Sequence, residues 1–350
     1  MEKPVVILTD YNSYQYYAIA EEIKRVLEEE GANVSLCHWW DARPHALNVI
    51  FVASVLKQTV DYLWRFGSET NIIFYGVVEG TPILSTPQKA IFKERNIRLI
   101  VPSKFCKDEL EAMDIPVEGI IPHAIDMKGP PVDAEFQAKI RRDMLESKPF
   151  KVLLNVSHNN ARKGLDKLLV AHKVIGRLFP EAFLILHTQA LRGYGGIDIK
   201  KYADILGLKR IWWTQMAGLF SEAKMNALYD MAYLYVCSSY AEGFCLPLIE
   251  SYRFNLPIVA VDAPPMNEIV KDKETGLLFP YDHIERFLIH DLMDAKMHIY
   301  DVDDLIDAIT LLMLDEGLRN RMSSKIEEVK AQYDSSIQYP KFMDYLEGVG

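Results

Sequence analysis

Two glutamates separated by seven residues form the strongest chemical pattern in the sequence. Glu242 and Glu250 follow an apolar run that ends at Cys237. A buried strand, a loop and then a helix are expected here, with Pro247 in the first helical turn, where a missing N–H costs nothing. Both carboxylates could then accept hydrogen bonds from hydroxyls of one ligand, beside helix-start amides that favour an anion. A sugar joined to a ribose through a diphosphate presents that pattern.

Two adjacent cations form a second pattern. Arg162 and Lys163 lie just before a predicted helix, in the run Asn-Val-Ser-His-Asn-Asn-Ala-Arg-Lys-Gly at 155–164. Positive charge at the start of a helix is locally unfavourable, and unfavourable local chemistry is expected at functional sites. Fixed cations beside backbone amides suit a diphosphate leaving group, whose charge grows in the transition state. A solvated helix terminus is the alternative interpretation.

Short apolar strands alternate with amphipathic helices, which predicts parallel sheets covered on both faces. One series begins at residues 5–9 and a second begins at residues 151–156. With 350 residues, the chain is expected to be an α/β protein of two facing Rossmann-like, doubly wound domains. We place these domains at residues 1–148 and 149–332, with a C-terminal helix at 333–350 that packs back on the first. Ligands of such folds bind at the carboxyl ends of the strands, in the cleft between the domains.

These patterns resemble the retaining glycosyltransferases with the GT-B fold, specifically glycosyltransferase family 4, also called glycosyl transferases group 1. Family members carry two glutamates seven residues apart, usually within E-G-F-G-L-P-x-x-E. This chain has Cys245 in place of the usual second glycine and matches at Glu242, Gly243, Phe244, Leu246, Pro247 and Glu250. The resemblance implies that Glu242 contacts the donor sugar and Glu250 the nucleotide ribose. Gly243, Phe244, Cys245 and Leu246 would complete this part of the donor site.

The cationic run resembles the same family. The Lys163-Gly164 pair matches its Lys-Gly motif, whereas many members have an arginine near position 157, where this chain has Ser157. Arg162 is therefore the candidate substitute for that charge, and Ser157 remains a donor-site candidate. His187 ends a strand of the second domain and is a candidate phosphate contact. The resemblance covers nearly all of the C-terminal half and is patchy in the N-terminal half.

The resemblance implies a hexosyltransferase-type enzyme (EC 2.4). It would move a sugar from a nucleotide-diphosphate-sugar to a hydroxyl acceptor with retention of anomeric configuration. The first domain would bind the acceptor, which could be a glycan, a lipid or another molecule, and the second would bind the donor. The nucleotide-sugar is a co-substrate, and no cofactor is expected. Two other classes stay open: a GT-B-fold sugar-nucleotide epimerase and a non-catalytic sugar-nucleotide-binding module.

Candidates on the acceptor side are less specific. Asn12 and Ser13 follow the first strand and either bind acceptor hydroxyls or cap the next helix. Glu79 follows another strand and is either an acceptor base or binding group or an ordinary loop carboxylate. His123 lies in a Pro-His-Ala-Ile-Asp run and is either a ligand contact or a structural histidine.

Composition and charge exclude several classes. The net charge of −10 argues against nucleic-acid binding and weakens attachment to anionic lipid by charge alone. Peripheral membrane contact stays open because many relatives act on lipid-linked acceptors. Without a signal-peptide pattern or a run of about 18 apolar residues, a cytoplasmic protein is expected. The four cysteines form no C-x-x-C pair and are expected to be reduced thiols.

No metal site is predicted from the sequence. Asp301-Val302-Asp303 looks like the D-x-D motif of metal-dependent glycosyltransferases, but it directly precedes a strongly periodic helix. Helix capping explains these carboxylates. The nine histidines show no ligand spacing. Selection of the nucleobase and the sugar is expected to depend on the loops near residues 214–219 and 264–267.

Overall fold

Apolar, β-branched segments of the first third of the chain form one six-stranded parallel sheet. The computed structural model describes residues 4–41, 48–95, 97–143, 146, 149–188, 195–214, 220–289 and 291–347. In sheet order, the strands are β2 (Val34–His38), β1 (Val5–Thr9), β3 (Asn48–Ser54), β4 (Asn71–Val77), β6 (Ile97–Val101) and β7 (Gly119–Ile120). Six of the seven residues of β3 are buried, as expected for a parallel strand covered on both faces.

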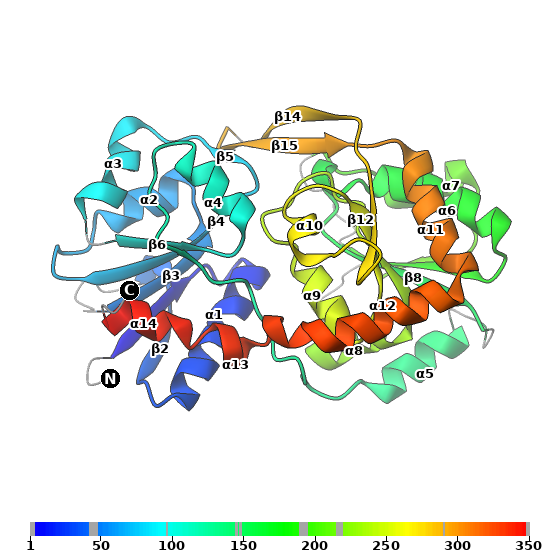
Figure 1. Ribbon diagram of the computed structural model, residues 1–350, viewed down its shortest axis with the longest axis horizontal. Coiled ribbons are helices and arrows are strands. Elements are labelled where there is room, and N and C mark those ends of the chain that lie inside the picture. Colours follow the sequence, from blue (N-terminus) through cyan, green and yellow to red (C-terminus); the bar gives the residue numbers. More distant parts are fainter. Residues whose placement is uncertain are drawn as a thin grey trace. The chain divides into compact units, whose positions relative to one another are not determined.

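Helices lie on both sides of this sheet (Figure 1). They are α1 (Tyr14–Glu29), α2 (Lys57–Leu63), α3 (Thr86–Glu94), α4 (Lys104–Glu111), α13 (Ser335–Gln338) and α14 (Lys341–Glu347), with a 3₁₀ turn, η1, at Trp39–Asp41. The first helix is amphipathic, as the alternation predicts: Ile19, Ile23, Val26 and Leu27 are buried on one face.

A second six-stranded parallel sheet begins at the predicted restart of the alternation. Its strands, in order, are β10 (Ile211–Trp213), β9 (Ala182–His187), β8 (Lys151–Val156), β11 (Ala232–Val236), β12 (Ile258–Val261) and β13 (Gly276–Phe279). Its helices are α5 (Ala134–Asp143), α6 (Leu165–Leu178), α7 (Ile199–Leu206), α8 (Glu222–Met231), α9 (Leu246–Arg253), α10 (Met266–Ile269), α11 (Val302–Leu314) and α12 (Glu316–Val329). The 3₁₀ turns η2 (Ala161–Lys163) and η3 (Lys330–Tyr333) complete the list. The predicted pair of Rossmann-like parallel-sheet domains is therefore confirmed.

The chain divides into two compact units. The first contains residues 1–127, 286–296 and 331–350, and the second contains 128–285 and 297–330. The division falls after Met127 and not near residue 148, which lies outside the described residues. The reason is that α5 packs on α8: the Asp133 N–H donates to the Ala223 carbonyl (3.0 Å), and the ring of Phe136 meets Phe220 edge-on at 5.3 Å.

Residues 331–350 are held in the first unit by specific hydrogen bonds. The Ser335 hydroxyl donates to Glu22 (2.5 Å), and the Tyr339 hydroxyl donates to the Ala124 carbonyl (2.9 Å). Tyr339 is fully buried. The end of the chain therefore contributes to the core of the first unit.

A three-stranded sheet was not predicted from the sequence. It consists of β14 (His283–Ile289), β15 (Met293–Ile299) and β5 (Thr81–Pro82), in that order. β15 pairs antiparallel with β5 through Met293 and Asp294. In β14 apolar and polar residues do not alternate, so its sequence lacks the period-two pattern by which a strand is predicted.

Loops at the carboxyl ends of β8 and β11 are joined by hydrogen bonds to backbone carbonyls, because the two strands are neighbours in the sheet. The Tyr240 N–H donates to the Arg162 carbonyl (2.7 Å), and the Ser238 hydroxyl donates to the Lys163 carbonyl (2.7 Å). Gly164 has φ +58 at this junction, and a Cβ there would overlap the carbonyl oxygen of Ser238. Glycine is required both for the left-handed conformation and for the close approach of the two backbones.

Gly164→Ala is expected to destabilise the protein by about 3 kcal/mol or more. The new methyl group would push the Ser238 carbonyl away, and alanine is strained at a positive φ. Gly31 is a matched control: it also has a positive φ, of +86, but its Cβ would meet nothing within 4 Å. Gly31→Ala should cost only about 1 kcal/mol. Urea denaturation of both variants measures the difference, and equal losses would contradict the steric argument.

Candidate functional site

A buried ion cluster lies where β8 and β11 end. The Lys163 ammonium contacts Glu242 Oε1 at 2.5 Å, and the Arg162 guanidinium donates to Glu242 Oε2 at 2.8 Å. Glu242 is 4% exposed and Lys163 is 6% exposed. Arg162 also donates to the Ala241 carbonyl (3.0 Å). The structure thus brings together the three residues that the sequence assigned to the leaving group and the sugar.

The electrostatics of this cluster keep Glu242 ionised. Burial raises the pKa of a carboxyl, but the Lys163 ammonium and the Arg162 guanidinium outweigh that effect and lower the pKa of Glu242 to about 2. Two cations therefore share one carboxylate, so the cluster carries an excess of one positive charge. Such a cluster is suited to an anionic group.

Glu250 lies in α9 and has a different environment. Its Oε2 accepts a hydrogen bond from the Tyr229 hydroxyl at 2.5 Å. Burial raises the pKa of Glu250, and the hydrogen bond from Tyr229 opposes that rise. The two glutamates of the motif therefore have different partners. Glu242 is bound by two cations, whereas Glu250 is bound by the phenol of Tyr229. Tyr229, in α8, was not assigned a site role from the sequence, because its contact depends on the packing of α8 against α9.

The segment between the glutamates has a particular backbone path. Cys245 precedes α9 with φ 76, in the left-handed region where glycine is usual. Gly243 and Phe244 precede it in the loop, Phe244 is buried, and Leu246 is the first helical residue. The Cys245 thiol lies 3.8 Å from that of Cys237, and both are free thiols. All four cysteines are free, as predicted.

Ser157 and His187 lie at the ends of neighbouring strands β8 and β9. The Ser157 hydroxyl donates to the Asn155 side chain (2.7 Å), and its N–H donates to the His187 carbonyl (3.1 Å). Burial, with a smaller contribution from His158, lowers the pKa of His187 to about 4, so the ring is neutral at neutral pH. His187 could reach a phosphate only as a neutral hydrogen-bonding group. The positive charge that pairs with Glu242 here comes from Arg162 and not from position 157, where the chain has a serine.

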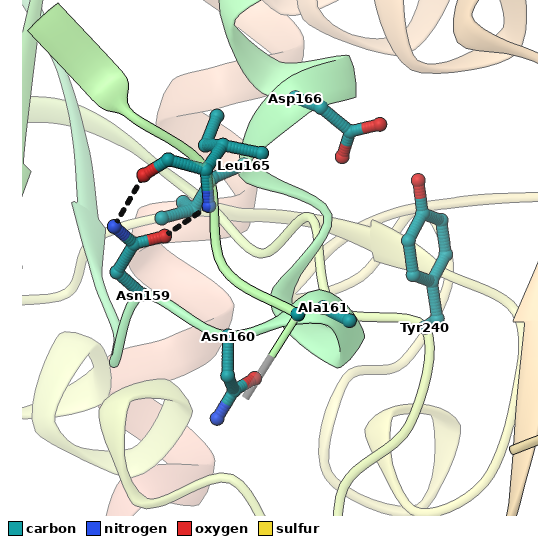
Figure 2. Close-up of a pocket in the computed structure, with 8 residues that line it drawn as sticks. Asn159, Asn160, Ala161, Leu165, Asp166 and Tyr240 are labelled. Atoms are coloured by element: carbon teal, nitrogen blue, oxygen red, sulfur yellow. Dashed lines mark hydrogen bonds between the residues drawn. The ribbon is translucent and has the colours of Figure 1, made fainter. Parts of the chain in front are cut away.

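A cavity of about 150 Å³ opens beside η2 in the second unit (Figure 2). Its lining consists of Asn159, Asn160, Ala161, Leu165, Asp166, Gly195, Ile197 and Tyr240. The side chain of Asn159 exchanges two hydrogen bonds with the backbone of Ile197, at 2.8 and 3.1 Å, which ties the wall of the cavity together. The lining includes residues of the two loops that carry Lys163 and Glu242, but neither of these two side chains.

The candidates of the first unit lie at the carboxyl ends of its strands. Ser13 occupies the N-cap position of α1 but makes no side-chain capping bond, and the Asn12 N–H donates to Asp10 at 2.9 Å. The Ser13 hydroxyl therefore does not cap α1. Glu79 follows β4, is half-buried, and its N–H contacts the sulfur of Met293 at 3.1 Å.

His123 lies in a buried environment of the first unit. Its Nδ1 is 2.8 Å from the hydroxyl of Tyr75, which also donates to the Ile121 carbonyl at 2.7 Å. Burial lowers the pKa of His123 to about 3, so it is neutral. These contacts favour the structural alternative for this residue.

No group of three or more His, Cys, Asp or Glu side chains in the described part of the chain is arranged to hold a metal ion. Asp301 caps α11 as predicted, accepting from the Asp303 N–H at 3.0 Å. Among the described residues, no helix is long and apolar enough to cross a membrane. The loop at 214–219, expected to select the nucleobase, lies outside the described residues except for Thr214, and Thr214 contacts the ring of His187 at 3.1 Å.

Comparison with known proteins agrees with this geometry. Residues 136–290 match the family described as Glycosyl transferases group 1. An uncharacterized glycosyltransferase of Sulfolobus islandicus rod-shaped virus 1 is 21% identical over 98% of this chain and 100% of its own length. Among solved structures, sucrose-phosphate synthase from Thermosynechococcus elongatus superposes with a TM-score of 0.74 at 15% identity, covering 100% of both chains. HepE of Anabaena in complex with UDP and glucose has a TM-score of 0.72 at 13% identity, covering 99% of this chain and 100% of that one.

These likenesses show the fold of the protein and support a class for it. The fold is that of GT-B glycosyltransferases, with two Rossmann-like parallel-sheet domains. The group 1 match, the fold and the name of the viral relative support a glycosyltransferase that uses a sugar donor.

Glu242→Gln is expected to lower the free energy of unfolding at neutral pH by about 3 kcal/mol, because it leaves the buried Lys163 and the partly buried Arg162 without their carboxylate. The folded-state pKa is lowered to about 2, so this stabilisation is present above the ordinary pKa of about 4.5 and is lost as the pH falls toward 2. The gap between wild type and variant should therefore shrink with acidification.

Urea denaturation at pH about 7 and about 3.5 measures that gap. Glu285→Gln serves as the control. Glu285 is exposed, and its carboxylate lies 3.2 Å from Nε2 of His283, which is also exposed. It should change stability by less than about 0.5 kcal/mol at both pH values. A Glu242→Gln gap that stays constant with pH would contradict the ion-pair account.

Proposed function

We propose that the protein transfers a hexose from a nucleotide-diphosphate-sugar to a hydroxyl acceptor with retention of anomeric configuration. The observation that carries this proposal is the buried cluster in which Lys163 and Arg162 share the carboxylate of Glu242. The group 1 match across residues 136–290 supports the same assignment. UDP is the first nucleotide to test, because the structurally similar HepE has been crystallised with UDP and glucose.

The excess positive charge of the cluster is the physical reason for a diphosphate donor. Lys163 has three N–H donors and Arg162 has five, so each can keep its bond to Glu242 and donate another to phosphate oxygens. When the bond between the sugar and the diphosphate breaks, negative charge accumulates on the leaving oxygen. Cations already fixed in a buried site stabilise that charge without reorganising.

The two glutamates bind hydroxyl groups in this proposal. Glu242 is ionised and accepts from a hydroxyl of the donor sugar beside the reacting carbon. Glu250, oriented by Tyr229, accepts from a ribose hydroxyl. Gly243, Phe244, Cys245 and Leu246 form the turn that fixes the spacing between these carboxylates. Ser157 and neutral His187 are further donor-site candidates at the neighbouring strand ends.

Retention follows if the acceptor hydroxyl attacks from the face that the diphosphate leaves. The anomeric carbon loses its bond to the phosphate oxygen and gains one to the acceptor oxygen, and the hydroxyl proton passes to the leaving diphosphate. No metal and no enzyme nucleophile takes part in this scheme. Glu79, Asn12 and Ser13 of the first unit are proposed to bind the acceptor, with Glu79 the candidate to assist proton removal.

Lys163→Ala is expected to lower the turnover number by about 10²–10³-fold while the protein stays folded, because Arg162 still neutralises Glu242. The assay measures release of UDP from UDP-glucose and other nucleotide-sugars. Lys200→Ala, an exposed lysine of α7 in the same unit, is the control and should act like wild type. Normal turnover of Lys163→Ala would refute the role of this lysine.

The product is expected to have the anomeric configuration of the donor, since both bonds lie on one face. Proton NMR of the product made from UDP-α-glucose, or from whichever donor is turned over, reads this directly from the anomeric coupling constant. An inverted product would rule out the same-face scheme. Conversion of the donor sugar to its epimer without consumption of an acceptor would instead identify an epimerase.

A further inference from the structure

Exposed aromatic side chains gather at one edge of the first unit. β1 and β2 are parallel neighbours, and their last residues, Thr9 and His38, pair in register. The loops that follow them therefore emerge at the same edge, where ligands of doubly wound sheets bind. Three aromatic residues of these loops and of the start of α1 are exposed: Tyr11 (45%), Tyr14 (50%) and Trp40 (58%). We call these three residues the aromatic cluster.

Ring contacts hold this surface in place. Tyr11 meets Tyr17 and His38 edge-on, at centroid distances of 5.0 and 5.3 Å. The Tyr11 hydroxyl donates to the Leu36 carbonyl at 3.1 Å. Trp40 packs on the buried Trp39 at 4.0 Å. The rings of Tyr11 and Trp40 are thus held by neighbouring side chains, so little conformational entropy is lost when a ligand covers them.

Hydrogen-bonding groups lie beside these rings. Asp10 Oδ1 accepts from the Asn12 N–H (2.9 Å) and contacts Nε2 of His38 (3.3 Å). Nδ1 of His38 accepts from the Trp40 N–H at 3.2 Å, so Nε2 carries the proton given to Asp10. Both of these bonds are made to Oδ1 of Asp10, so Oδ2 can accept a hydrogen bond from a ligand. The Ser13 hydroxyl, which does not cap α1, is in the same loop.

Acidic side chains are present among the described residues of this edge. Burial raises the pKa of Tyr11, and Cys37, Asp41 and Glu21 add to that rise, so acidic groups lie near the ring. No lysine or arginine lies between Asp10 and Ile23 or between Gly31 and Asp41; Lys24 and Arg25 follow the first stretch, and Arg43, outside the described residues, follows the second. An anionic ligand, whether a lipid phosphate or a sulfated glycan, would be repelled by these described residues.

We infer that the aromatic cluster binds a neutral saccharide, which is the acceptor of the proposed transfer. A pyranose presents weakly positive C–H groups on its faces and hydroxyls around its rim. The faces match the negative π-faces of Tyr11, Tyr14 and Trp40, and the hydroxyls match Asp10 and Ser13. An alkyl chain would use the rings but would leave the carboxylate of Asp10 without a partner. The inference rests on the proposed function only for the identification of this saccharide as the acceptor.

Direct binding tests the inference without any donor. Saturation-transfer NMR would measure contact between the full-length protein and a panel of neutral oligosaccharides that includes gluco-, galacto-, manno- and N-acetylhexosamine types. We expect binding to at least one neutral oligosaccharide, and we expect Trp40→Ala to weaken it about fivefold or more. Trp40→Phe should restore part of the affinity. Trp64→Ala is the control: Trp64 is also an exposed tryptophan of the same unit (40%), lies outside the cluster, and its loss should leave binding unchanged.

Three results would overturn the inference: no binding to any neutral oligosaccharide, equal binding by Trp40→Ala, or preference for sulfated oligosaccharides, peptides or phosphatidylglycerol vesicles. Release of UDP from nucleotide-sugars by the same variants separates this outcome from failure of the proposed function. Trp40→Ala should change donor hydrolysis less than twofold, because the donor residues lie in the second unit. Saccharide binding without donor turnover would refute the transferase and leave the saccharide site standing.

Discussion

The buried carboxylate of Glu242 is the constraint on which the donor half of the molecule depends. Removing a carboxylate from water costs several kcal/mol unless cations and hydrogen bonds replace the lost hydration. Lys163 and Arg162 do this from the neighbouring strand end. Their position requires β8 and β11 to be adjacent and Gly164 to let the two backbones touch. Among these three side chains one positive charge is left in excess, and that imbalance is the physical basis for the proposed diphosphate donor.

The two units carry opposite chemistry at the carboxyl ends of their strands. In the second unit, buried cations outnumber the carboxylate that holds them. In the first, exposed aromatic rings are accompanied by Asp10 and Asp41, with Tyr11 mounted on a fixed base. An anionic donor would be favoured by the cations of the second unit. This difference in chemistry is the basis on which we propose different units for the two substrates.

Much of the fold could be predicted from the sequence, because parallel strands buried on both faces are continuous apolar runs. The first helix, the restart of the alternation at Lys151 and the cap at Asp301 all follow from local patterns. The hairpin of β14 and β15 could not be predicted, since β14 has exposed residues on both faces and shows no period. The division after Met127 also escaped prediction, because the side on which α5 packs depends on its contacts with α8 and Phe220.

The sequence by itself determined the residue types of the site: a glutamate pair separated by seven residues, a Lys-Gly after a strand, and the absence of metal-ligand spacing. These signals are local, since each depends only on neighbours within one turn or loop. Only the tertiary structure decided which charges meet. It placed Arg162 on Glu242 although Ser157 stands where an arginine was expected, gave Glu250 a phenol partner in Tyr229, and buried His123 against Tyr75. These contacts join residues far apart in the chain, and their distances are set by strand order and helix packing, which no local spacing encodes.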